Sequence, residues 1–89
     1  MTVINSSKNN ILISSDIVYE GSEIIKPRGS WCDGGMNLYI LNIHSELGSC
    51  EIKTKYGKTF IRNFGKLYAK VSNEKDQKGM KMIIVTSVE

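Results

Sequence analysis

Apolar residues in this sequence occur in short runs, and glycine or polar residues break each run before it reaches the length of an ordinary helix. Nowhere do apolar side chains recur at the i, i+3, i+4 spacing of an amphipathic helix over three turns. Short runs with glycine between them are typical of β-strands joined by tight turns. The pattern therefore predicts an all-β fold with little or no helix.

The two longest runs indicate central strands. Residues 36–43 and 80–88 are nearly continuous in apolar side chains, so we expect both faces of these strands to be covered. Shorter runs indicate further strands at 11–13, 17–19 and 24–25. In a chain of 89 residues, we expect six to seven short antiparallel strands in a single β domain, residues 1–89, folded as a small barrel or a two-sheet sandwich.

Positive charge is concentrated in one segment. The chain has a formal net charge of +3, whereas residues 51–70 hold six basic side chains against the single acid Glu51 and so carry +5, which leaves −2 for the remainder. The pairs Tyr56-Gly57 and Phe64-Gly65 fit two-residue hairpin turns. We therefore expect three strands to pair as one basic meander, at 50–55, 58–63 and 66–72.

Successive side chains of a strand point to opposite faces of its sheet. In the basic meander, one face is then aliphatic, and the other carries Phe64 together with Lys53, Lys55, Lys58, Phe60, Arg62, Lys66, Tyr68 and Lys70. Cations pair with phosphates, and flat rings stack on unpaired bases. This face predicts binding of single-stranded nucleic acid or of a nucleotide-like anionic ligand. In the alternative interpretation, Phe60 and Phe64 pack in the core of a curved barrel, and the cations form a solvated rim.

A second candidate site is the segment 27–35, whose proline and glycines favour an irregular loop. It presents Arg28, Trp31 and Asp33 as candidates for loop binding, because Trp and Arg are enriched at the centres of binding interfaces. Alternatively, Trp31 folds back and closes one end of the core.

Motifs for catalysis or cofactor binding are missing from the sequence. The only histidine, His44, has no Asp, Cys or Ser in a known motif relation to it, and the two cysteines, Cys32 and Cys50, cannot make a four-ligand metal site. No glycine-rich phosphate loop occurs. We therefore expect a binding protein that is not an enzyme and that uses neither a metal nor another cofactor.

The size and apolar content of the chain also predict its partners and its location. The runs 36–43 and 80–88 carry more apolar surface than so short a chain readily covers, so we expect a homo-oligomer, with a closed monomeric barrel as the alternative. The N-terminus lacks a signal-peptide pattern, and no apolar run approaches the ~20 residues of a membrane span. These features predict a cytoplasmic protein with reduced cysteines and no membrane partner.

A second class of function is a small inhibitor of the kind that phages and mobile elements carry. Such a protein would bind or sequester a host protein or a signalling molecule. The stand-alone size, the lack of catalytic motifs and the turn-rich loop that presents Arg28 and Trp31 favour this interpretation.

Several short segments resemble the ring-forming tryptophan-activated RNA-binding attenuation proteins. They are Arg28-Gly29-Ser30, the apolar strand 38–43, Ser49, and Ile-Lys-Thr-Lys-Tyr-Gly-Lys at 52–58, where Tyr56 is inserted before the glycine. Those proteins are all-β chains of similar length that bind RNA through a basic pair on a strand and hold free tryptophan between subunits. The resemblance implies RNA contacts at Lys53 and Lys55, and a ligand near Arg28, Ser30 and Ser49.

Overall fold

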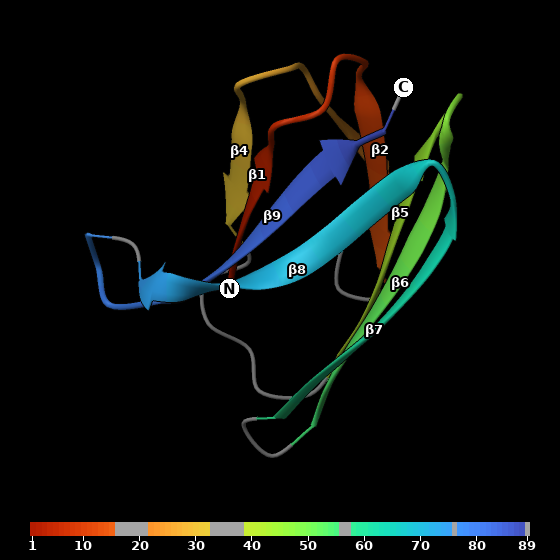
Figure 1. Ribbon diagram of the computed structural model, residues 1–89. Helices are drawn as coiled ribbons and strands as arrows, with labels where there is room; N and C mark the ends of the chain where they lie inside the picture. The colour runs from red at the N-terminus through yellow and green to blue at the C-terminus, as the bar shows by residue number, and fades with distance from the viewer. Residues whose placement is uncertain (16–21, 33–38, 56–57, 76, 89) are drawn as a thin grey trace.

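Nine β-strands, and no helix, form the regular structure of residues 1–15, 22–32, 39–55, 58–75 and 77–88, which the computed structural model describes (Figure 1). In chain order the strands are β1 (Thr2–Asn5), β2 (Ile11–Ser15), β3 (Ser22–Ile25), β4 (Ser30–Cys32), β5 (Tyr39–Ser45), β6 (Gly48–Lys55), β7 (Lys58–Gly65), β8 (Leu67–Lys75) and β9 (Lys81–Ser87). The all-β prediction is confirmed, but the structure has nine strands where six to seven were expected.

The strands form two sheets that share one core and do not close into a barrel. The four-stranded sheet has the order β4-β1-β9-β8, and the five-stranded sheet has the order β3-β2-β5-β6-β7. The structure is therefore the two-sheet alternative of the prediction. The expectation of antiparallel strands is wrong for β1 and β9, which pair in parallel. A parallel pair needs a long crossover connection, and here the whole chain between the first and last strands supplies it.

The core forms because alternate side chains of the strands point between the sheets. The four-stranded sheet contributes Val3, Leu67, Ile83 and Val85, and the five-stranded sheet contributes Ile11, Ile13, Leu41, Ile43 and Ile52, each at most 1% exposed. β5 is the middle strand of its sheet, as expected for a central strand. However, Ile40 on its outward face is 40% exposed, so the expectation of two covered faces is wrong there. A two-layer sandwich covers each sheet on one face only.

Two strands of the four-stranded sheet were not anticipated. β1 forms at the N-terminus, and β4 lies inside the segment 27–35 that was expected to be irregular. Both are held by pairing, since Val3 lies opposite Trp31 on one side and opposite Ile83 on the other. The predicted strand at 17–19 and the predicted turn Tyr56-Gly57 lie outside the described residues.

The third strand of the predicted basic meander belongs to the other sheet. β6 and β7 pair as expected, with Lys55 opposite Lys58, but β8 pairs with β9. The predicted turn Phe64-Gly65 is the end of β7, and after it the chain crosses between the sheets. At this crossing, the side chain of Asn63 accepts a hydrogen bond from the Ala69 N–H (3.1 Å) and donates one to the Ala69 carbonyl (3.4 Å). The Asn63 side chain on β7 thus bonds the backbone of β8, which the predicted meander would have paired with the backbone of β7.

Candidate functional site

The outward side of the β6–β7 hairpin carries most of the predicted binding residues. Phe60 lies opposite Lys53, and Arg62 lies opposite Glu51. Phe60 is 58% exposed and Phe64 is 50% exposed. The alternative in which the two phenylalanines pack in the core is therefore wrong, because the inward positions of the hairpin belong to residues of the other parity, such as Ile52. We call this surface the basic–aromatic face and define it as Lys53, Lys55, Lys58, Phe60, Arg62 and Phe64.

The rings and the cations of the basic–aromatic face alternate along β7. Side chains two apart on a strand are about 7 Å apart, so Phe60 and Phe64 are separated by about 13 Å, with Arg62 between them. The guanidinium carbon of Arg62 lies 5.9 Å from the centroid of the Phe64 ring. That distance is within the range of a cation–π contact, which orients the guanidinium beside an open ring.

One acid lies among the cations of the basic–aromatic face. Glu51 lies between the cations, and its carboxylate is 3.5 Å from the Lys53 ammonium. An exposed pair of this kind contributes little to stability, because water and salt screen it. Lys55 and Lys58 lie at the tip of the hairpin, which Figure 1 shows extending away from the four-stranded sheet. The arrangement leaves the cations accessible to an anionic partner.

Three of the predicted binding residues do not join this face. Tyr68 and Lys70 are exposed on β8, in the other sheet, and Lys66 lies at the corner between β7 and β8. Leu67 and Ala69, the neighbours of Tyr68, point into the core, so Tyr68 points away from it. The predicted set therefore divides between the outward faces of two sheets.

The loop candidates also have separate environments. Trp31 is half-buried and packs against the core from β4, opposite Val3. Arg28 is exposed, has φ of +70°, and donates its backbone N–H to the Asn5 carbonyl at 2.7 Å. Asp33 lies outside the described residues.

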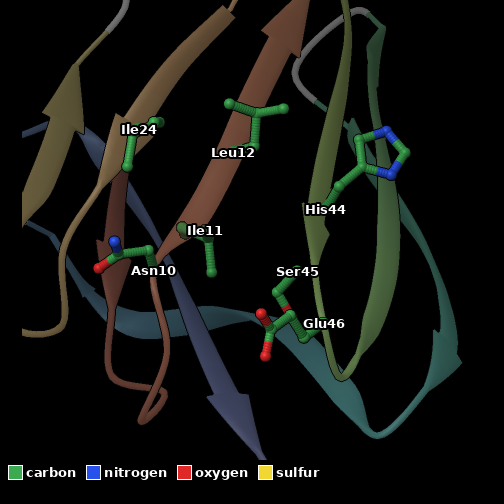
Figure 2. Close-up of a pocket in the computed structure, with 7 residues that line it drawn as sticks. All are labelled: Asn10, Ile11, Leu12, Ile24, His44, Ser45 and Glu46. Carbon is green, nitrogen blue, oxygen red and sulfur yellow. The ribbon is translucent and has the colours of Figure 1, made fainter.

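A shallow groove of about 300 Å³ lies at the other end of the same outward surface (Figure 2). Its floor is apolar, with Leu12 from β2 and Ile24 from β3, and the hairpin turn between β5 and β6 adds Glu46. His44 lies at its edge, and Figure 2 shows the imidazole pointing away from Leu12 and Ile24. Sequence reasoning did not find this groove, because it depends on the register of three strands.

The described residues show no cluster of metal-ligating side chains, and the two thiols differ in exposure. The described part of the chain contains no group of three or more His, Cys, Asp or Glu side chains that could hold a metal ion. Both cysteines are free thiols, with Cys32 exposed and Cys50 buried. Burial raises the pKa of the Cys50 thiol to about 11 and so disfavours its reactive thiolate form.

The residues that the resemblance implied for a small ligand are not brought together. Arg28 and Ser30 belong to the turn before β4 and to β4 itself, in the four-stranded sheet. Ser49 lies on β6 in the five-stranded sheet, where it is opposite His44 and Phe64.

Comparisons of this chain with models of known protein families, with curated proteins and with solved structures find no match. In the part of the chain that the structure describes, no helix is long and apolar enough to cross a membrane.

Proposed function

We propose that this protein binds single-stranded nucleic acid through the basic–aromatic face. The observation that carries the proposal is the position of Phe60 and Phe64, two rings at least half exposed on one strand with Arg62 between them. Base–aromatic stacking contributes about 1–3 kcal/mol per base, and neighbouring cations neutralise phosphates. A ring exposed without a partner costs hydration free energy, so a stacked ligand would compensate for that cost.

The spacing favours a strand over a single nucleotide. Phe60 and Phe64 are about 13 Å apart, which exceeds the reach of one base but suits two positions along an extended chain. Lys53, Lys55 and Lys58 continue the charge toward the tip of the hairpin. A polyanion would contact all of these cations at once, whereas a mononucleotide would contact only a few.

The test is fluorescence anisotropy with labelled single-stranded RNA and DNA of about 12 nucleotides, a length within known site sizes. We expect binding at low salt that weakens steeply as salt rises. A plot of the logarithm of the binding constant against the logarithm of the salt concentration should have a slope of about −0.7 for each phosphate neutralised. Arg62→Ala should make this slope shallower by about 0.7, the value for one phosphate contact. Phe60→Ala should weaken binding about tenfold and leave the slope unchanged. The matched control is Tyr68→Ala, which removes an exposed ring from the other sheet. If the wild-type protein shows no binding at low salt, the proposal is wrong.

A protein partner is the second candidate for the same surface. Ile24 is 64% exposed and Ile40 is 40% exposed on the outward face of the five-stranded sheet, and a protein partner would remove these apolar side chains from water. Affinity capture from a host lysate with the wild-type chain and with Ile24→Ser separates the two functions. A partner that survives nuclease treatment and is lost with Ile24→Ser would favour inhibition or sequestration of a protein.

Self-association is a related proposal for the same apolar positions. A second copy of the chain would cover Ile40, which lies near the start of β5, whereas His44 lies near its other end. Light scattering after size exclusion tests it: Ile40→Lys should reduce a dimeric mass to 10.0 kDa. A wild-type chain that elutes as a monomer at every concentration would contradict it.

A further inference from the structure

We propose that His44 and Phe64 are the two walls of a slot over Ser49, and that this slot takes one unpaired base of a bound strand. The inference rests on the proposed function and adds a stacking position and a residue, His44, to it. It begins from the register of three neighbouring strands. Ser49 on β6 lies opposite His44 on β5 and opposite Phe64 on β7.

The three side chains stand on the outward face of the five-stranded sheet. Their neighbours Ile43 and Cys50 are buried, so the alternate positions point away from the core. His44 and Phe64 are exposed, and Ser49 between them is only partly covered. A small side chain thus lies between two ring-bearing ones in a single row across the sheet.

The width of the slot suits one flat heterocycle. Neighbouring strands are about 4.8 Å apart, so the backbones under His44 and Phe64 are separated by about 9.6 Å. Stacked aromatic rings have centroids at least about 4.5 Å apart, so a base between two rings needs about 9 Å in total. Figure 2 shows the His44 imidazole pointing away from Leu12, that is, away from β2. The walls therefore have room for one base and not for two.

The chemistry of the slot also matches a base in a strand. The Ser49 hydroxyl at its floor can both donate and accept a hydrogen bond, which any base edge can satisfy. The Arg62 guanidinium lies beside the outer wall, 5.9 Å from the Phe64 ring centroid, where it can reach the phosphate next to a stacked base. We therefore expect the slot to be tolerant of base identity, as stacking sites generally are.

The experiment uses the same anisotropy assay with variants that change the slot without changing charge. Ser49→Leu fills the space between the walls and should weaken binding about tenfold, the loss expected for one stacked base. The matched control is Ser30→Leu, an exposed serine on a strand of the other sheet, which should bind as the wild type does. Circular dichroism of both variants checks that the fold is kept.

Substitutions of His44 distinguish a stacking contact from a charge contact. His44→Ala should weaken binding about tenfold, His44→Phe should restore it, and His44→Lys should not, because only a flat ring can form the wall. Restoration by lysine and not by phenylalanine would overturn the slot and indicate a simple charge contact.

The two proposals fail in different ways. If Ser49→Leu and His44→Ala bind as tightly as the wild type while Phe60→Ala and Arg62→Ala bind weakly, the slot is wrong and the proposed function stands. If the wild-type chain binds neither RNA nor DNA, both are wrong.

Discussion

The side-chain amide of Asn5 donates a 2.9 Å hydrogen bond to the backbone carbonyl of Ile25, and this bond joins β1 of the four-stranded sheet to β3 of the five-stranded sheet. Asn5 is completely buried. Its amide also donates to the Asn9 carbonyl at 2.9 Å, and its oxygen accepts from the Ser7 N–H at 3.0 Å. The side chain therefore uses its donors and its acceptor inside the protein, as a buried amide must.

We expect Asn5→Ala to be among the most destabilising single changes in this chain. It would remove the donor to the Ile25 carbonyl and the acceptor of the Ser7 N–H, at about 1–3 kcal/mol for each buried group, whereas the Asn9 carbonyl keeps the Ser7 hydroxyl as a donor at 3.0 Å. Allowing for relaxation, we expect the free energy of unfolding to fall by about 3 kcal/mol in urea denaturation. The control Asn73→Ala, at an exposed position on β8, should change it by less than about 0.5 kcal/mol. Equal midpoints for Asn5→Ala and the wild type would contradict the role of Asn5.

Two glycines allow the stability cost of a left-handed backbone to be measured apart from the cost of a close contact. Gly65 and Gly79 have nearly the same φ, +76° and +78°. A Cβ on Gly65 would lie 2.8 Å from the Leu47 carbonyl oxygen, whereas a Cβ on Gly79 would have no atom within 4 Å. Gly79→Ala should therefore cost only the left-handed conformation, about 1–2 kcal/mol, and Gly65→Ala should cost about 1–3 kcal/mol more. Urea denaturation of both variants measures the difference, and equal losses would show that the crossing after β7 relaxes to accept the methyl group.

The two thiols should differ in reactivity. Cys32 is exposed, whereas Cys50 is 2% exposed and burial raises its pKa from 9.0 to about 11. At pH 8 only about 0.1% of Cys50 would be thiolate, so a thiol reagent should modify Cys32 alone in the native protein. The second thiol should react only after unfolding. Loss of the fast phase in Cys32→Ser is the control, and fast modification of both thiols in the native state would contradict the burial of Cys50.

The same raised pKa predicts a loss of stability in alkali. The folded protein holds the Cys50 proton more tightly than the unfolded chain, so this contribution is complete below pH 9 and is lost as the pH rises toward about 11. The measured quantity is the difference in free energy of unfolding between the wild type and Cys50→Ala. We expect that difference to shrink as the pH rises, and a constant difference would contradict the prediction.

Trp31 should stabilise the fold without contributing to binding. It packs against the core from β4, so Trp31→Ala should lower the free energy of unfolding by about 3 kcal/mol, and Trp31→Phe should recover part of the loss. Nucleic-acid affinity of the folded Trp31→Phe variant should equal that of the wild type, because Trp31 lies in the sheet opposite the basic–aromatic face. A folded Trp31→Phe variant that fails to bind would instead identify Trp31 as a binding anchor.

The β6–β7 hairpin shows what the alternation of side chains along a strand can predict. Alternation predicted that Phe60 and Arg62 share a face with Lys53, and the register of the hairpin confirms that they do. Alternation also predicted correctly that Tyr68 and Leu67 point to opposite faces of their strand. The expected meander, however, put both residues in the wrong sheet. Period two reports which side chains point inward, whereas it says nothing about which strand lies alongside.

What the sequence alone determined about this protein is the all-β class, the positions of most strands and the inward or outward direction of their side chains, because steric preference and hydrophobic alternation act within a few residues. Tertiary structure decided which sheet each strand joins, since that choice depends on contacts between distant segments: the parallel pairing of β1 with β9 and the Asn63 bonds to Ala69 that mark the crossing. It also decided that Ser49 lies between His44 and Phe64, because a row across three strands exists only once their registers are set.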